Sequence, residues 1–298
     1  MRVGDALLDL ARAGGARSLF VVGTGKNVGK TVVVRAVAER AIARGLALGI
    51  TSLGRDGESA DVLDAQAKPR LRLAPGTVVA TARDVLPRHP ASEILDLSDL
   101  QTAAGTLLYA RVRRSADYEL VGPPTASGIR SAVARFFELG CEQTIVDGAI
   151  DRVAALAGGE DAIVVATGAS GAASQAEAVE AIAALVRRLS LPRYDPSQPF
   201  VRVEGALTAA LAARFMESAE RHQIVVGDPT QITIAGKAFD RVADRFALRC
   251  ERPLRVVAAT VAPIGREGYF EPRGFARAVA GATGLPTFDV FAAAMVAA

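Results

Sequence analysis

The sequence has few of the residues on which covalent and metal chemistry usually depends. Among its 298 residues there are two cysteines, two histidines and no tryptophan. Cys141 and Cys250 lie far apart, which gives neither a disulfide framework nor the spacing of a zinc site and favours a reducing compartment. His89 and His222 stand in ordinary polar contexts, so the sequence supports no catalytic histidine triad and no histidine metal cluster. The small-residue segments also lack the strand–elbow pattern of a serine hydrolase.

Charge and hydropathy argue against two further classes of partner. The net charge of +3 is small for this length, and the one basic cluster, Arg111, Arg113 and Arg114, lacks interleaved aromatic residues that could stack on bases. We therefore expect no nucleic-acid partner. No apolar run approaches the ~20 residues that span a bilayer. Because Asp5 and Asp9 interrupt the apolar start, it is a poor signal peptide. The chain is expected to be soluble and cytoplasmic, with no membrane partner.

Short β-branched runs alternate with longer runs rich in Ala, Arg and Glu, which is typical of βα units. Several short runs are apolar throughout, as in strands that are covered on both faces. The sequence thus predicts an α/β fold with a mostly parallel, doubly wound sheet. The expected strands lie at 18–23, 47–53, 76–82, 105–113, 118–122, 143–148, 161–167, 200–205, 222–227, 230–236, 254–260 and 287–291. The expected helices follow residue 30 and lie at 128–139, 172–189, 206–221, 237–247 and 274–281.

A proline-rich stretch divides the chain. "SLPRYDPSQPF" holds three prolines in eleven residues and predicts a linker near residues 190–199. We expect a nucleotide-binding domain over residues 1–190 and a C-terminal α/β lobe over residues 200–298. As an alternative, the second part continues the sheet of the first.

The most informative motif is "FVVGTGKNVGKTVVV", residues 20–34. An apolar strand ends at Gly23 and an amphipathic helix begins near Lys30, with glycines between them that let the main chain turn and approach an anion closely. The helix N-terminus adds N–H donors and a partial positive charge. Lys30 can then reach the β- and γ-phosphates of a nucleotide, and the Thr31 hydroxyl can bind Mg²⁺. The expected nucleotide-binding residues are Gly23, Thr24, Gly25, Lys26, Asn27, Val28, Gly29, Lys30 and Thr31.

The motif departs from G-x-x-x-x-G-K-[ST] at one position. The first glycine of that pattern would stand at residue 24, which is Thr24, and Gly23 and Gly25 flank it instead. The alternative interpretation is an ordinary glycine-rich turn that carries a surface lysine. Lys26 likewise is either a phosphate ligand or a solvated loop residue.

A phosphate loop with Mg²⁺ needs a carboxylate on the metal side. "TIVDGAIDR" is an apolar run that ends in Asp147, which we expect to hold Mg²⁺; the alternative is a strand-end aspartate that caps a turn, and Asp151 is the next candidate. "TSLGRDGES" follows the strand after the first helix. There Asp56 is expected to bind Mg²⁺ or to orient the attacking water, with Glu58 as a weaker candidate, although Asp-Gly is also a common turn.

Two more loops run from a predicted strand into a helix. "VGPPTASGIR" (121–130) and "VATGASGAAS" (165–174) carry Ser, Thr and Gly where the helix begins. These residues can donate to an anion or can simply cap the helix, and the sequence leaves both readings open.

The "GT…VGKT" frame resembles the deviant P-loops of the dethiobiotin-synthetase-like and MinD-like NTPases. This resemblance implies Mg²⁺ and ATP or GTP as ligands, and contact between the "VAPIGREG" segment (261–268) and the nucleotide base. Lys26 is similar to the extra signature lysine of the MinD-like group, although it stands one position closer to Lys30. That lysine contacts phosphate across a dimer interface, so the resemblance implies a homodimer.

Several segments of residues 1–175 together resemble a P-loop family identified as the reactivase subunit of lysine and ornithine aminomutases. They are "GITSLGRDGE", "APGTVVATA", "EILDLSDLQTAAGTLLYARVR", "ELVGPPTASGIR" and "TIVDGAIDR". The resemblance implies an ATP- or GTP-hydrolysing accessory factor that acts on a partner enzyme, a cobalamin-dependent aminomutase, with Lys30 and Asp56 as the catalytic residues. Two alternatives stay open: a small-molecule ligase or kinase similar to dethiobiotin synthetase, and a nucleotide-dependent binding module.

Overall fold

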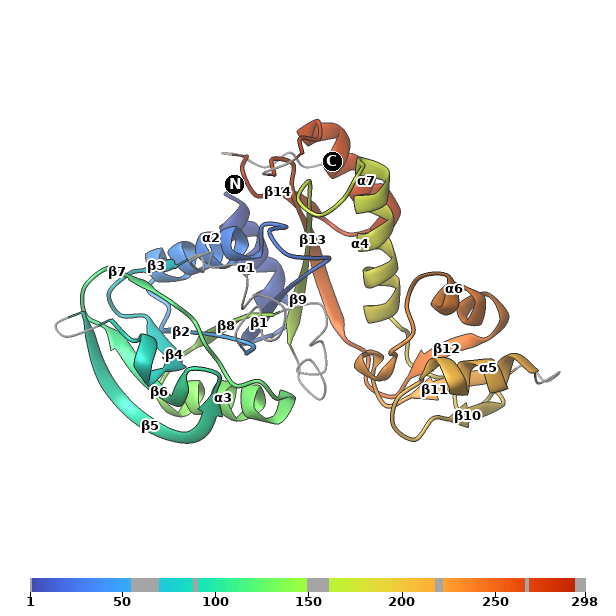
Figure 1. Ribbon diagram of the computed structural model, residues 1–298, viewed down its shortest axis with the longest axis horizontal. Coiled ribbons are helices and arrows are strands. Elements are labelled where there is room, and N and C mark those ends of the chain that lie inside the picture. The colour runs from blue at the N-terminus through green and yellow to red at the C-terminus, as the bar shows by residue number, and fades with distance from the viewer. Residues whose placement is uncertain are drawn as a thin grey trace.

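A nine-stranded sheet between two layers of helices forms the body of the protein (Figure 1). The computed structural model describes residues 2–54, 70–87, 91–148, 161–217, 222–265 and 268–292. In spatial order the strands are β14 (Thr287–Asp289), β13 (Arg255–Ala262), β9 (Ala162–Gly168), β1 (Ser18–Gly23), β8 (Gln143–Asp147), β2 (Leu48–Ser52), β4 (Val78–Ala82), β6 (Gly105–Val112) and β5 (Ser92–Thr102).

The strands from β14 to β4 run parallel to one another, and β6 and β5 extend that edge as an antiparallel pair. This arrangement confirms the predicted α/β fold with a mostly parallel, doubly wound sheet. β1 is central and buried along its whole length, with Val21 beside Val164 of β9 and Asp147 of β8. Its neighbours on the two sides come from later parts of the chain, and in open α/β sheets ligands bind at the carboxyl ends of the strands where the strand order reverses in this way.

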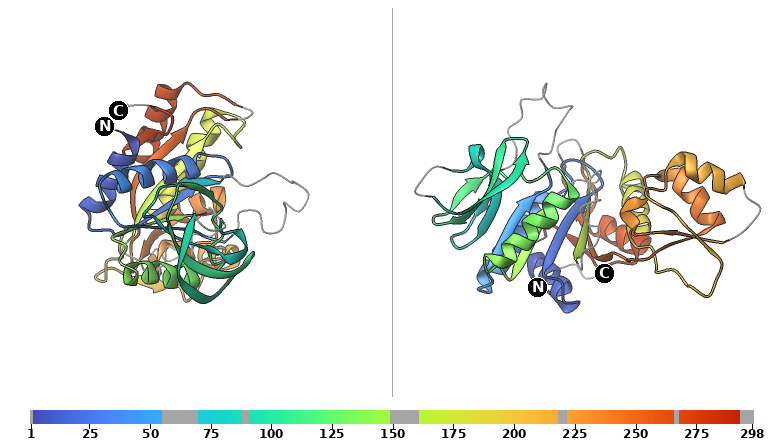
Figure 2. Two further views of the ribbon diagram at one scale, coloured as in Figure 1. Left: turned by 90° about the vertical axis from the view of Figure 1, so that its left-hand side faces the viewer. Right: turned by 90° about the horizontal axis from the view of Figure 1, so that it is seen from below.

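The helices cover the two faces of the sheet unequally (Figure 2). On one face lie α1 (Val3–Ala13) and α2 (Lys30–Ala43), and on the other lie α3 (Ala126–Glu138), α4 (Gln175–Leu189) and α7 (Pro272–Thr283). The predicted helix after residue 30 is confirmed, and it buries Val33, Val34, Val37 and Ala41 against the sheet. Outside these layers are the antiparallel ribbon of β3 (Leu71–Leu73) and β7 (Ala116–Tyr118) and a short 3₁₀ turn, η1 (Arg83–Val85).

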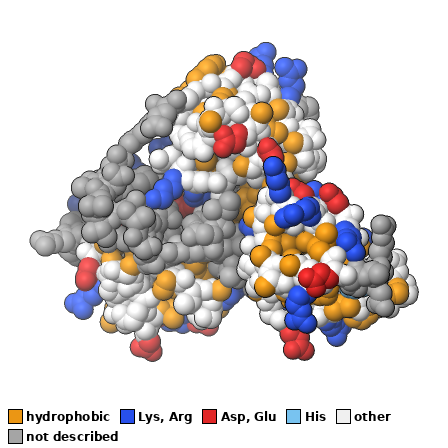
Figure 3. Space-filling view, turned by 45° about the vertical axis from the view of Figure 1, so that its right-hand side comes forward, with side chains coloured by type: hydrophobic (Ala, Val, Ile, Leu, Met, Phe, Trp, Pro, Cys, Tyr) orange, Lys and Arg blue, Asp and Glu red, His pale blue; other side chains and the backbone are white. Residues whose placement is uncertain are grey.

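A smaller α/β lobe follows the proline-rich stretch at 190–199. It contains the parallel strands β10 (Phe200–Arg202), β11 (Gln223–Val226) and β12 (Ala247–Cys250), with helices α5 (Ala209–Glu217) and α6 (Gly236–Arg245). It has its own core around Ile224 and Phe239, and Figure 3 shows it as a separate protrusion. After β12 the chain returns to the main sheet through β13 and β14, so the lobe is inserted before these strands. Across the described ranges, none of the helices is both long and apolar enough to cross a membrane.

One predicted strand is wrong and several elements were not predicted. Residues 230–236 form no strand, because Asp228 accepts a hydrogen bond from the amide of Thr230 and Pro229 starts a 3₁₀ turn, η3 (Pro229–Gln231), before α6 begins at Gly236. The predicted strand at 118–122 is displaced, since β7 ends at Tyr118. The sequence pattern does not predict α1, β3, β5 or β12.

The tight contact between β2 and α3 gives a test of the fold. A Cβ on Gly49 would lie 2.6 Å from two ring carbons of Phe136, which is itself fully buried. We expect Gly49→Ala to lower the free energy of unfolding by about 1–3 kcal/mol, because the ring must shift within a packed core. The control is Gly281→Ala in α7, where a Cβ meets nothing within 4 Å and should add about 0.5–1 kcal/mol. Denaturant unfolding measures both, and equal effects would contradict the described packing.

Candidate functional site

The loop between β1 and α2, residues 24–29 (hereafter the β1–α2 loop), lies at the carboxyl end of the central strand. Its backbone includes two left-handed residues, Asn27 (φ 58°) and Gly29 (φ 93°), which turn the chain into α2. Asparagine and glycine are the residues that adopt this conformation most easily. The sequence therefore encodes the turn locally.

Lys30 folds back across this loop. Its Nζ donates a hydrogen bond to the carbonyl oxygen of Gly25 at 2.7 Å. Gly23 makes room for this path, because a Cβ there would lie 2.7 Å from Cγ2 of Val28 and 3.1 Å from Cγ and Cδ of Lys30. An ammonium group has three donors, so two remain beyond the one given to Gly25. The arrangement holds a positive charge over the mouth of the loop.

The first turn of α2 differs from the first turns of α3 and α4. Thr125 caps α3 by accepting from the amide of Gly128 at 3.1 Å, and Ser174 caps α4 by accepting from the amide of Glu177 at 3.2 Å. Gly29 caps α2 and has no side-chain oxygen that could accept from the first-turn amides. These amides, together with the helix dipole, are the donors that bind anions at helix N-termini. For loops 121–130 and 165–174, the hydrogen bonds of Thr125 and Ser174 favour the capping interpretation.

Asp147 and Thr31 occupy the same side of the sheet. Asp147 ends β8 beside Val21 of β1, and its carbonyl oxygen accepts from the amide of Leu53 at 2.8 Å. Side chains alternate along a strand, and Ile145 lies in the core formed with α2. Asp147 therefore points to the face on which α2 begins with Lys30 and Thr31. Its Oδ1 is shielded from solvent.

The opposite wall of the site comes from β9, β13 and β14. A Cβ on Gly29 would lie 3.0 Å from Cβ of Ala262 and 3.4 Å from Cγ2 of Val290. Nearby positions after β13 and β14 expose large apolar side chains, namely Ile264 (57% exposed), Tyr269 (65%) and Phe291 (47%). The sequence predicts a base contact for segment 261–268. It gives no sign of Tyr269, Val290 or Phe291, because those positions carry no motif.

The remaining predicted residues fall into three groups. Lys26 and Asn27 are exposed at the tip of the β1–α2 loop, whereas Val28 is buried beneath it. Thr24 is tied to β9, since its amide donates to the carbonyl oxygen of Ala166 at 2.9 Å. Asp56, Glu58 and Asp151 lie outside the described residues.

Other chemistry is not supported by the described residues. Among them, no group of three or more His, Cys, Asp or Glu side chains is arranged to hold a metal ion. Burial raises the pKa of both the Cys141 and the Cys250 thiols to about 11, so neither is a ready nucleophile near neutral pH. A shallow cavity of about 360 Å³ beside Arg17 and Glu142 lies at the amino ends of β1 and β8, at the edge of the sheet opposite the β1–α2 loop.

The comparisons with known proteins leave the site to be judged on its geometry. No family model matches the chain, and no curated protein matches it. The geometry gives a glycine-rich loop, an overlying lysine, a helix N-terminus without a capping side chain, and a strand-end carboxylate on the same face.

The two glycines of the β1–α2 loop should differ in their tolerance of a side chain. Gly29→Ala must adopt φ 93° against Ala262, and we expect the free energy of unfolding to fall by about 1–2 kcal/mol. Gly25→Ala should leave it nearly unchanged, because a Cβ there meets only Cγ1 of Val28, at 3.9 Å, and the backbone is not left-handed. Thermal or urea unfolding of the two variants checks the difference. A stable Gly29→Ala protein would show that the described turn is wrong.

Proposed function

We propose that the protein is a Mg²⁺-dependent nucleoside-triphosphate-binding protein that hydrolyses ATP or GTP. The observation that carries this proposal is the path of Lys30, whose ammonium group lies over a glycine-rich loop at the uncapped start of α2. Main-chain amides at such a loop cradle phosphates, and the lysine neutralises their charge. The β1–α2 loop with Gly23, Lys30 and Thr31 is the proposed phosphate site.

The donor set on the α2 face suits Mg²⁺. A threonine hydroxyl and a carboxylate are hard oxygen ligands, and Mg²⁺ is commonly held by one or two carboxylates with substrate phosphates. Thr31 and Asp147 would hold the ion, which when bound neutralises charge that develops on the phosphates. We propose from the sequence alone that Asp56 orients the attacking water or binds the metal ion.

The exposed apolar residues that follow β13 and β14 suit a nucleotide base. Tyr269 and Ile264 are each more than half exposed, and Phe291 is nearly half exposed. Aromatic side chains stack on bases of any identity. This composition favours neither adenine nor guanine, so both ATP and GTP belong in the experiments.

We infer that hydrolysis serves a partner enzyme. Catalysis at a P-loop depends on positioning and charge neutralisation, so a slow basal rate that rises with a partner is expected. The resemblance of segments in residues 1–175 to the aminomutase reactivase family makes a cobalamin-dependent aminomutase the proposed partner. By the resemblance of Lys26 to a signature lysine, the protein would dimerise when nucleotide is bound.

Lys30→Ala is the first test of nucleotide binding. A hydrogen bond to a charged group is worth about 1.5–3 kcal/mol, so the Kd for MgATP or MgGTP should rise about 10- to 100-fold. Isothermal titration calorimetry measures this change. Lys237→Ala is the matched control, because Lys237 is an exposed lysine on α6 in the small lobe. Wild-type protein that binds neither nucleotide with Mg²⁺ present would refute the proposed function.

Asp147→Asn tests the metal side of the site. We expect the variant to lose most of the gain in affinity that Mg²⁺ gives to the wild type, because a neutral amide is a weaker ligand than a carboxylate. Nucleotide affinity in EDTA should stay unchanged. Asp99→Asn, at an exposed position of β5, is the control. If Mg²⁺ strengthens binding equally in both variants, Asp147 is not a ligand.

A further inference from the structure

Two threonine hydroxyls join the β1–α2 loop to β9 and α4. Oγ1 of Thr24 lies 3.1 Å from Oγ1 of Thr167, at the end of β9. Oγ1 of Thr167 lies 3.3 Å from the carbonyl oxygen of Ala178, in the first turns of α4. Thr167 is fully buried. The loop, the neighbouring strand and a helix on the far face of the sheet thus meet at one hydroxyl group.

The direction of these hydrogen bonds follows from the chemistry of the last acceptor. The carbonyl of Ala178 has no proton, so Thr167 donates to it; a hydroxyl has one proton, so Thr167 must accept from Thr24. The amide of Thr24 already donates to Ala166 at 2.9 Å. Both donors of Thr24 are therefore used within the protein. A phosphate oxygen needs a donor, and Thr24 has none left while this chain of hydrogen bonds holds.

We propose that Thr167 is a positioning residue for the phosphate site, which acts through Thr24 without touching the nucleotide. Thr24 stands where the usual motif has a glycine, and its side chain gives the loop an anchor that glycine lacks. Fixing the loop before binding reduces the ordering that the nucleotide must otherwise impose. This inference rests on the proposed nucleotide binding and assigns Thr24 an anchoring role in place of a phosphate contact.

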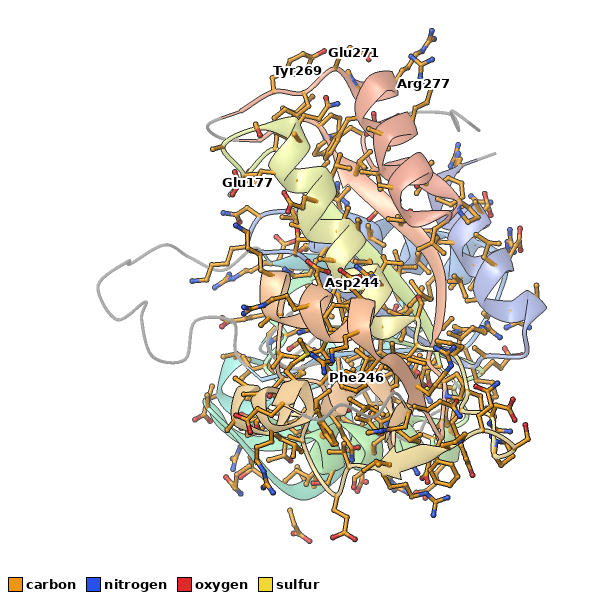
Figure 4. All side chains as sticks on the ribbon, turned by 90° about the vertical axis from the view of Figure 1, so that its right-hand side faces the viewer. Glu177, Asp244, Phe246, Tyr269, Glu271 and Arg277 are labelled. Atoms are coloured by element: carbon orange, nitrogen blue, oxygen red, sulfur yellow. The ribbon has the colours of Figure 1, made fainter. Side chains whose placement is uncertain are left out.

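Helix α4, to which Thr167 donates, also contacts the small lobe. α4 begins after its cap at Ser174. Near its other end, Arg187 donates to two carboxylates of α6 in the lobe, Asp240 at 2.9 Å and Asp244 at 3.1 Å. Figure 4 shows Glu177 toward one end of α4 and Asp244 of α6 alongside the other part of the helix. Thr167 thus contacts the same helix that reaches the lobe through Arg187.

The test compares Thr167→Val, Thr24→Val and the double variant by calorimetry with MgATP and MgGTP. Loss of one net hydrogen bond should raise Kd about 3- to 10-fold in each single variant. The double variant should bind no more weakly than either single one, because the two changes break the same chain. Thr167→Ser keeps the hydroxyl and should bind within about twofold of the wild type.

Thr260→Val is the matched control. Thr260 is a fully buried threonine on β13, in register with Ala166 of β9, and its hydroxyl has no hydrogen-bond partner in the described part of the chain. Its replacement should leave Kd unchanged. Thermal unfolding of every variant identifies temperatures at which all are folded. Should Thr167→Val fail to fold, Thr24→Val and Thr167→Ser still carry the comparison.

Two results would overturn the inference. Binding by both valine variants at the wild-type level would show that the hydroxyl chain does not position the loop. A larger loss in Thr24→Val than in Thr167→Val, with additive effects in the double variant, would show that Thr24 contacts phosphate itself. In both cases the wild type still binds nucleotide and Lys30→Ala binds it about 10- to 100-fold more weakly. That pattern separates these results from a failure of nucleotide binding as such.

Discussion

Gly168, at the end of β9, has little room for a side chain: a Cβ there would lie 3.2 Å from Cα of Val28 and 3.0 Å from the carbonyl oxygen of Ala262. The main chains of the β1–α2 loop, β9 and β13 therefore meet in van der Waals contact at one point. The other features of the site depend on this contact. It seats Val28 under the loop, brings Thr24 within reach of Thr167, and leaves Lys30 to cross above Gly23.

Much of this arrangement follows from the sequence, because the controlling signals are local. Apolar runs of limited length define buried parallel strands, and Gly23, Gly29 and Lys30 mark the junction of strand and helix. The sequence pattern does not reveal β5, for a physical reason. It is an edge strand with bulges near Leu95 and between Leu97 and Gln101, so its apolar residues do not alternate regularly, and Leu97 is largely exposed. The return of the chain to the main sheet after the small lobe is a tertiary feature that no local pattern encodes.

The site itself could be predicted only in part. Ser and Thr residues after a strand can cap the next helix or can donate to an anion, and both uses need the same residue types. Their partners decide between these uses: Thr125 and Ser174 accept from amides of their own helices. The motif predicts Thr24 as a nucleotide ligand. Its engagement with Ala166 and Thr167 depends on the position of β9, a strand more than a hundred residues later in the chain.

The hydrogen bond of Lys30 explains how an ordered loop can still suit an anion. Its bond to the carbonyl of Gly25 is an interaction between a charged donor and a neutral acceptor. That bond is already strengthened by the charge of its donor, and a phosphate oxygen would add an opposite charge and with it a direct Coulomb attraction. In the proposed phosphate site, this attraction favours exchange of the Gly25 carbonyl for a phosphate oxygen as the acceptor of Lys30. Because the loop is held from below through Val28 and Thr24, the ammonium group is the part left free to make this exchange.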